Sequence, residues 1–333
     1  MTKNSPLLQA FCDPVTHEPL MQAEKGLSSR SGVSFEFLDD ECRVVDFIAP
    51  SIVSAADDVN LQMYNDEQST EKYRNFLNWL FATFNVEEAN FRADLTRRLN
   101  LNRGMKVLVV GCGLGEDIPA ILEAIGPEGE LHAQDISKSM VQNASTHLRA
   151  DNASFSVSNA TQLPYRSRYF DVVFHFGGIN LFGDMKKAIA ELERVCKIGG
   201  RVMFGDEGIA PHLRGTEYAD VLINNNGLWA LHAPVDSLPH NAEDIHVSYV
   251  LGNCFYLISF APTEGLPKVD LDIPHIGTRG GSARTRYFGK IEGVTEKTKL
   301  KLAAAAKRRG ISVHDLLEAL INENTESEDG TLG

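Results

Sequence analysis

The stretch VVGCGLGED, residues 109–117, joins the end of an apolar run to the start of a predicted helix. Three glycines alternate with other residues in it: Gly111, Gly113 and Gly115. Because glycine has no Cβ and readily adopts positive φ, such a turn lets backbone amides approach a ligand closely. Glu116 and Asp117 follow where the helix begins. Acidic side chains there would repel the pyrophosphate of a dinucleotide, whereas a cationic ligand tolerates them.

Strands and helices alternate around this turn. Apolar runs predict strands at 106–110, 129–136, 153–160, 170–177 and 199–207, and periodicity predicts helices at 117–126, 137–150 and 184–196. The alternation favours an α/β fold, a Rossmann-like doubly wound sheet that is mostly parallel. Residues 248–260 are expected to add an antiparallel edge. Ligands of such sheets bind at the carboxyl ends of the strands.

Composition narrows the partners. The net charge of −13 disfavours nucleic acid as the principal partner. The chain has no apolar run of about 18 residues, and its first residues lack the apolar core of a signal peptide. Five scattered cysteines fit a reducing compartment better than a disulfide framework, so we expect a cytoplasmic protein without a membrane span.

Four stretches in order resemble class I S-adenosylmethionine-dependent methyltransferases, over about residues 104–207. VLVVGCGLGED is similar to their first motif, and HAQDIS to the acidic strand end that holds the ribose. NATQLPYRSRYFDVVF resembles the adenine-contacting turn with the fourth strand, and AIAELERVCKIGGRVMF the helix, turn and fifth strand. The branch that it resembles acts on small molecules and includes ubiquinone and menaquinone methyltransferases. Asn159 stands where that branch often has Asp, and Ile198 replaces a usual proline.

The resemblance implies S-adenosyl-L-methionine as cofactor and a set of contacts to it. These would come from Gly111, Cys112, Gly113, Gly115, Asp135, Ile136, Asn159, Ala160, Phe176 and Tyr64. Asp135 would accept hydrogen bonds from the ribose hydroxyls, and the Asn159 carbonyl from the adenine amino group. Tyr64 corresponds to an upstream aromatic that often closes over the cofactor in this branch.

Methyl transfer from a sulfonium requires in-line alignment of a nucleophile and usually removal of a proton. Asp206 and Glu207 follow the fifth strand, and His175 lies in the fourth, so all three are candidate general bases. The alternatives are a helix cap for the two acids and a satisfied core position for His175. Trp229 and His232 lie in the segment 208–247, where the family commonly inserts a substrate lid, and they are candidate substrate contacts.

Both ends of the chain carry further features. CDPVTHEPL resembles the start of a zinc-ribbon-like module found in some methyltransferases, including ribosomal RNA enzymes. Only Cys12, His17 and Cys42 are available as ligands, so we expect no metal. Residues 279–309 hold ten basic residues against two acidic ones. Among them, Arg279, Arg284 and Arg286 beside a Gly-Gly turn either bind an anionic substrate group or pair with the acidic body.

The segment VTEKTKLKLAAAAKRRGISVHDLLEALI resembles the helices of ribbon-helix-helix proteins, with RTRYFGKIEGV as a loose match to the ribbon. We expect a homodimer contact, or docking on the body, rather than DNA binding. The predicted organisation is therefore a small metal-free N-terminal β module at 1–55, a class I methyltransferase domain at 56–265, a basic loop with C-terminal helices at 266–325 and a disordered tail at 326–333.

The predicted function is S-adenosylmethionine-dependent methyl transfer to a small molecule by in-line displacement. Two alternatives remain: an RNA methyltransferase, suggested by the ribbon-like N-terminus, and a DNA-binding regulator that senses S-adenosylmethionine, suggested by the basic C-terminal helices.

Overall fold

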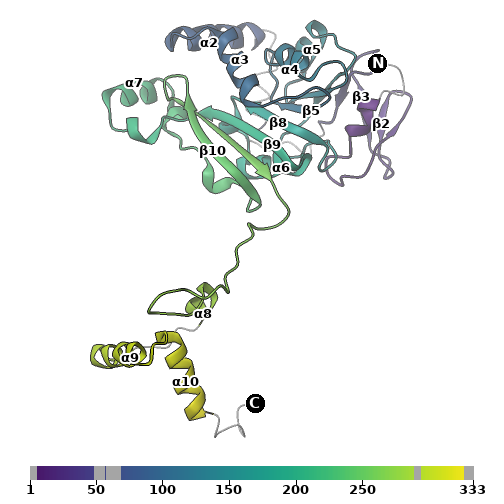
Figure 1. Cartoon of the computed structure of the whole chain (residues 1–333). Helices are drawn as coiled ribbons and strands as arrows, with labels where there is room; N and C mark the ends of the chain where they lie inside the picture. Colours follow the sequence, from purple (N-terminus) through teal and green to yellow (C-terminus); the bar gives the residue numbers. More distant parts are fainter. Residues whose placement is uncertain (1–5, 49–56, 58–68, 289–293, 326–333) are drawn as a thin grey trace. The chain divides into compact units, whose positions relative to one another are not determined.

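The computed structural model describes residues 6–48, 57, 69–288 and 294–325. They fall into two compact units, Met1–Leu266 and Pro267–Gly333. The first unit is built on a sheet in the order β1-β2-β3-β4-β7-β6-β5-β8-β9-β11-β10. The second unit contains helices α8 to α10 (Figure 1).

The centre of the sheet is parallel. Its strands are β5 (Lys106–Val110), β6 (Glu130–Asp135), β7 (Ala153–Val157), β8 (Phe170–Phe176) and β9 (Cys196–Glu207). β11 (Phe255–Pro262) pairs antiparallel with β9, and β10 (Ala242–Val250) antiparallel with β11. The predicted doubly wound sheet with an antiparallel edge is confirmed.

Helices cover both faces of this sheet, as its strands, apolar on both sides, require. On one face lie α2 (Ser69–Thr83), α3 (Glu88–Arg98), α4 (Ile118–Ile125) and α5 (Lys138–His147). On the other lies α6 (Met185–Val195), which buries Ile189, Leu192 and Val195 against the sheet. The predicted cap of α5 is present, since the Ser137 hydroxyl accepts a hydrogen bond from the backbone N–H of Met140 at 3.3 Å.

The N-terminal segment extends the same sheet. After the 3₁₀ turn η1 (Pro6–Ala10) come β1 (Met21–Gln22), β2 (Gly26–Ser28), β3 (Ser34–Phe37) and β4 (Val44–Asp46). The first four strands pair antiparallel in turn, and β4 then pairs parallel with β7. Phe11 and Phe35 pack their rings at a tilt against Phe47 within the core that also contains residues of β5 and β8. The expected N-terminal β module is thus continuous with the main sheet and core.

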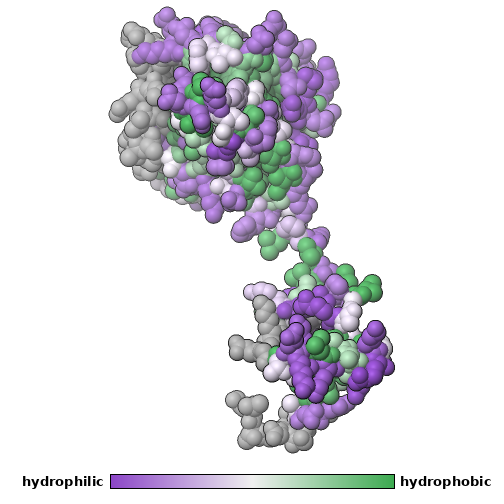
Figure 2. All heavy atoms as spheres, turned by 90° about the vertical axis from the view of Figure 1, so that its left-hand side faces the viewer, coloured by the Kyte–Doolittle hydropathy of each residue, from purple (hydrophilic) through white to green (hydrophobic). Residues whose placement is uncertain are grey.

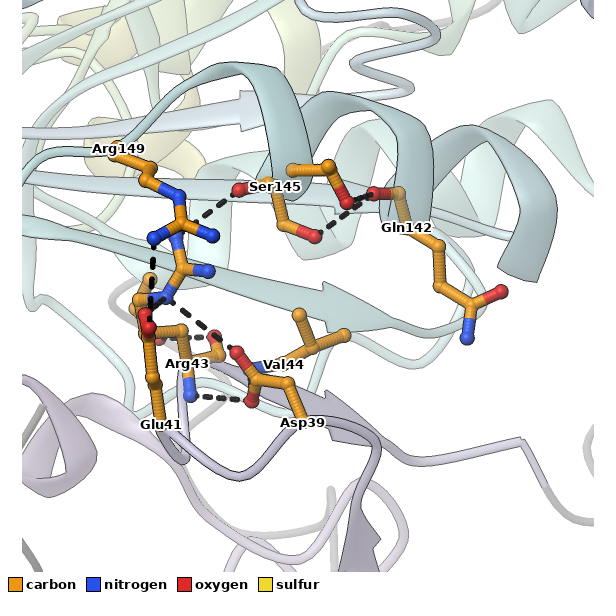
Figure 3. Close-up of polar contacts among 9 residues, drawn as sticks. Asp39, Glu41, Arg43, Val44, Gln142, Ser145 and Arg149 are labelled. Carbon is orange, nitrogen blue, oxygen red and sulfur yellow. Dashed lines mark hydrogen bonds and ion pairs between the residues drawn. The ribbon is translucent and has the colours of Figure 1, made fainter.

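Arg43 ties this extension to α5 (Figure 3). It is buried and donates to the Ser145 carbonyl at 3.0 Å. Its Nε lies 2.8 Å from a Glu41 carboxylate oxygen and 3.4 Å from one of Asp39. Asp39 also accepts from the backbone N–H of Arg43 and Val44, which closes the turn between β3 and β4. A buried cation with these partners fixes where the extension meets the helix.

The segment 208–247 contains η4 (Pro211–Leu213), α7 (Glu217–Asn225), η5 (Gly227–Ala230), η6 (Val235–Ser237) and the start of β10. Tyr218 and Val221 on α7 are exposed, as are Phe76 and Trp79 on α2. Figure 2 views the molecule from the side of α2 and α7, and hydrophobic residues lie among hydrophilic ones on this face of the body.

The second unit contains α8 (Ala283–Phe288), α9 (Glu296–Arg309) and α10 (Val313–Thr325), and Gly310, with φ +65°, caps the end of α9. Arg284–Phe288 are helical, so this part of RTRYFGKIEGV is not the ribbon strand that the ribbon-helix-helix resemblance requires; residues 289–293 lie outside the described residues. Across both units, none of the described helices combines the length and apolarity needed to cross a membrane.

Candidate functional site

A partly enclosed cavity opens at the carboxyl ends of β5, β6, β7 and β8, with about 740 Å³ of empty space when the solvent at its mouth is included. Four of its walls are strand ends and loops: the turn after β5 (Gly111, Gly113), the end of β6 (Gln134, Asp135, Ile136), the loop after β7 (Asn159, Ala160), and the end of β8 with its loop (His175, Gly177, Gly178, Leu181, Phe182). Asp57, Tyr73 of α2 and Met140 of α5 complete the lining. Its position is that of a small-molecule site in an α/β sheet.

The glycine turn faces this cavity through two of its three glycines. Gly111 and Gly113 have φ of +62° and +53°, and the space a Cβ would take at Gly111 lies 3.1 Å from the His175 ring. Gly115 serves packing instead, since a Cβ there would lie 2.5 Å from Leu148 Cδ1. Cys112 is buried beneath the turn, and its N–H donates to the Gln134 carbonyl at 2.8 Å. Neither residue lines the cavity.

Asp135 brings a carboxylate to the cavity at the end of β6. Its two oxygens accept from the N–H groups of Gly113 and Ser137, each at 2.9 Å. Burial raises the pKa of Asp135, and these backbone hydrogen bonds oppose the increase by stabilising the ionised form. A carboxylate so held can still accept from a vicinal diol, because each oxygen has two lone pairs.

Asn159 lines the cavity but is turned differently from the expectation. Its carbonyl oxygen accepts from the N–H and the hydroxyl of Thr161, both at 2.9 Å. Its amide nitrogen donates to Asp57 at 3.0 Å. Thr161 thus uses both lone pairs of this oxygen, so the hydrogen bond from an adenine amino group to it stays a prediction, and it would require Thr161 to move.

His175 lines the cavity, and its two ring nitrogens have different surroundings. Nδ1 lies 2.8 Å from the Val110 carbonyl, which only accepts, so Nδ1 carries the proton of the neutral ring. Nε2 is then an acceptor, and it is buried without a hydrogen-bond partner among the residues that the structure describes. Burial lowers the pKa of His175, with opposing contributions from the bond to Val110 and from Asp206, so the ring is neutral near pH 7.

Residues 101–238 match a protein family described as a methyltransferase domain. This region is a class I methyltransferase domain. The demethylmenaquinone methyltransferase of Geobacillus kaustophilus is 31% identical over 140 residues, 41% of this chain and 55% of the relative. The ubiquinone/menaquinone biosynthesis C-methyltransferase of Burkholderia vietnamiensis is 33% identical over 147 residues, 43% and 54%. The chain spans about half the length of the curated relatives it matches.

The fold agrees with this assignment. The phosphoethanolamine N-methyltransferase 2 of Haemonchus contortus, solved in complex with S-adenosyl-L-methionine, superposes with a TM-score of 0.50 at 13% identity. The match covers 65% of this chain and 62% of that one. S-adenosyl-L-methionine is the cofactor of the class, and the cavity fits it: two glycines expose the backbone, and Asp57 and Asp135 are carboxylates suited to a cationic ligand.

Glu116 and Asp117, which follow the glycine turn of this methyltransferase domain, form ion pairs with arginines of α2 and α3. Glu116 pairs with Arg74 of α2, and Asp117 with Arg92 of α3 at 2.9 Å. Glu88 contacts both arginines, at 3.0 and 2.7 Å. The two arginines compensate the negative charge of Glu116 and Asp117 at the start of α4. Repulsion of a pyrophosphate by these acids is therefore weaker evidence against a dinucleotide than the sequence suggested. The acids instead join α2 and α3 to the glycine turn.

The two acids at the end of β9 do not line the cavity of the methyltransferase domain. Asp206 is fully buried, and its oxygens accept from the N–H of Asn180 at 2.6 Å and of Glu207 at 2.9 Å. Asn180 also donates to the Glu207 carbonyl at 2.8 Å and accepts from the Tyr256 hydroxyl at 2.9 Å. Neither acid caps a following helix. Asp206 instead fixes the loop that carries Gly177 to Phe182 into the cavity wall.

Glu207 is not set up as a base either. Burial raises its pKa to about 10, with Asp206 contributing in the same direction, so it is protonated at neutral pH. Of the three predicted bases, His175 alone lies in the cavity wall. Phe176, its neighbour in β8, points to the opposite face of the sheet and packs on Phe91 and Phe255, so it does not reach the predicted cofactor position.

The predicted substrate contacts lie elsewhere in the described chain. Trp229 is buried against Trp79 and Phe84, at ring-centroid distances of 6.3 and 6.1 Å. His232 is exposed, and neither lines the cavity. Tyr64 lies outside the described residues. Tyr73 of α2 supplies an aromatic side chain to the cavity wall, and only its helical position near the turn could have suggested it.

The three predicted anion-binding arginines, Arg279, Arg284 and Arg286, belong to the second unit. Arg284 donates to Asp272 at 2.8 Å, and Arg286 donates twice to the Gly280 carbonyl, at 2.9 and 2.6 Å. Both therefore have partners in their own unit. Within the described part of the chain, no group of three His, Cys, Asp or Glu is placed to hold a metal.

Proposed function

We propose that this chain transfers the methyl group of S-adenosylmethionine to a small-molecule acceptor of the quinone-precursor class. The observation that carries the proposal is the cavity at the strand ends, where exposed glycine backbone and the Asp135 carboxylate meet. The acceptor class is supported by the relatives, whose names state menaquinone and ubiquinone biosynthesis.

Bound S-adenosylmethionine supplies a methyl group already activated by the sulfonium, for in-line displacement by the acceptor's nucleophilic atom. The chain's own residues bind and orient. Asp135 holds the ribose hydroxyls, with Ile136 and Ala160 as apolar walls beside the adenine. The bonds from Asn180 to Asp206 and Glu207 keep the loop after β8 in place on the other side of the cavity.

His175 is a residue of the cavity wall that can accept a proton, beside the carboxylates of Asp57 and Asp135. Its Nε2 is a lone-pair acceptor in the neutral ring, and the bond from Nδ1 to the Val110 carbonyl fixes the orientation of that ring. We assign to it the acceptance of a hydrogen bond or proton from the methyl acceptor. Asp206 acts indirectly, through Asn180, and Glu207 stays protonated.

The test uses the purified full chain with S-adenosylmethionine carrying a labelled methyl group. Separate incubations contain a demethylated quinol, bulk RNA and duplex DNA. We expect label in the quinol fraction, and a stable product that depends on enzyme. Label in RNA alone would establish the RNA methyltransferase, and tight duplex binding at physiological salt without methyl transfer would establish the regulator. Either result would refute the proposal.

Two further expectations accompany it. We place the reaction in the cytoplasm, where the five buried cysteines would remain free thiols. We also expect two copies to associate through α9 and α10, because Leu300, Ile311 and Ile321 are exposed there. Light scattering gives the number of chains per particle for the full chain and for a version ending at Leu266. The same number for both would exclude association through α9 and α10.

A further inference from the structure

Asp57 is a buried carboxylate in the cavity wall that no sequence motif pointed to. Only 4% of the surface of Asp57 is exposed to solvent. One oxygen accepts from the N–H of Gly183 at 3.2 Å, and the other from the amide nitrogen of Asn159 at 3.0 Å. Gly183 follows the loop after β8 and Asn159 follows β7, so Asp57 joins the two loops that flank one end of the cavity.

The orientation of Asn159 decides which group can recognise a hydrogen-bond donor there. Rotating its amide by 180° would place an NH₂ group against the N–H of Thr161, two donors facing one another. The carbonyl of Asn159 therefore stays with Thr161, and its NH₂ group faces Asp57. At this end of the cavity, Asn159 offers a donor and Asp57 offers the carboxylate.

We propose that Asp57 accepts the hydrogen bond from the exocyclic amino group of adenine, and that Asn159 is a positioning residue that holds this carboxylate. The inference rests on the proposed function. The amino group is a donor and needs an acceptor, and a carboxylate accepts several hydrogen bonds at once. In the branch that residues 104–207 resemble, position 159 is often Asp; here the carboxylate comes from Asp57, one hydrogen bond away from that position.

The experiment measures binding of S-adenosylhomocysteine and of its hypoxanthine analogue, S-inosylhomocysteine, to the full chain by titration calorimetry. The analogue carries a carbonyl in place of the amino group, so Asp57 should reject it. In D57N the amide can donate to that carbonyl. We expect D57N to weaken S-adenosylhomocysteine binding about ten- to a hundredfold. We expect the preference for adenine over hypoxanthine to collapse.

Two further variants separate recognition from folding. N159D places two carboxylates against each other and should weaken binding, and D57N/N159D restores one acid and one amide and should recover part of the affinity and of the adenine preference. D151N, at an exposed turn before β7, removes the same charge and should leave both affinities unchanged. Because the preference is a ratio measured on folded protein, a lower melting temperature of D57N does not obscure it.

The outcomes are distinct. If D57N leaves the affinities for both ligands unchanged, the role of Asp57 is overturned but the cofactor assignment stands. If D57N weakens both ligands by the same factor, Asp57 has a structural role and the inference is also overturned. A wild-type chain that binds neither ligand refutes the proposed function itself.

Discussion

Replacing Gly111 by alanine tests whether the glycine turn and His175 are fitted to one another. The backbone at Gly111 has φ +62°, a left-handed conformation that costs an L-residue about 1–2 kcal/mol. The new Cβ would also lie 3.1 Å from two ring atoms of His175. That ring is buried and bonded to the Val110 carbonyl, so it can yield only by leaving its rotamer, at about 0.5–1.5 kcal/mol.

Gly113 provides a matched control. Its φ of +53° carries the same backbone cost, but the nearest atom to its new Cβ would be the Tyr73 hydroxyl oxygen at 3.4 Å, an ordinary contact. We therefore expect G111A to lose about 2–3 kcal/mol of unfolding free energy and G113A about 1–2 kcal/mol.

Urea unfolding of the full chain, followed by fluorescence, measures the two losses side by side. The midpoint of G111A should lie below that of G113A with equal slopes. If G113A is as destabilised as G111A, the clash with His175 is not felt, and the rigid fit between turn and ring is refuted.

Three other predictions follow from named contacts. His132 is buried among the rings of Phe11, Tyr165 and Phe170 with neither nitrogen hydrogen-bonded among the described residues, and burial lowers its pKa to about 3. Because the unfolded chain protonates this imidazole more readily, the free energy of unfolding should fall as pH drops from about 6.5 towards 3, by up to about 1.4 kcal/mol per pH unit. In urea unfolding, H132F should show a smaller dependence of stability on pH. An unchanged pH dependence in H132F would contradict the prediction. R43M should lower the free energy of unfolding by about 3 kcal/mol, because Asp39 and Glu41 lose their buried partner. R149M, at an exposed arginine 3.7 Å from Glu41, should lower it by less than about 1 kcal/mol. Thermal unfolding distinguishes the two variants, and similar losses would contradict the role given to Arg43. D206N should lower the rate of methyl transfer at least about tenfold, because the Asp206 carboxylate holds the loop that contains Asn180. E207Q should retain activity at pH 7, because Gln resembles the protonated acid. An unchanged rate in D206N, or an inactive but folded E207Q, would refute these roles.

Much of the fold was predictable because its signals are local. Apolar runs and caps located the central strands and helices, and Ser137 marked the start of α5. The resemblance also placed Asp135 and the glycine turn in the site. Contacts between distant segments were not visible in this way. The sequence around Asp57 gives no sign that its carboxylate accepts hydrogen bonds from Asn159 and Gly183, more than 100 residues away.

The catalytic candidates show the same limit. Strand alternation places His175 and Phe176 on opposite faces of the sheet, yet both were predicted to belong to the site, His175 as a base from its strand and Phe176 as a cofactor contact from the resemblance. Asp206 looked like a pocket residue because it ends a strand. Its carboxylate is used by Asn180, from a loop that packs back on the strand end, and only the three-dimensional path of that loop reveals this use.

The parallel pairing of β4 with β7 has a consequence for the methyltransferase domain as a separate entity. All five residues of β7 are buried, and Val44 to Asp46 satisfy its outer backbone groups. A shortened chain beginning after residue 48 would present β7 as a bare apolar edge, a template for pairing between molecules. The region recognisable from its relatives is therefore not a self-sufficient fold here, and we expect such a truncation to aggregate.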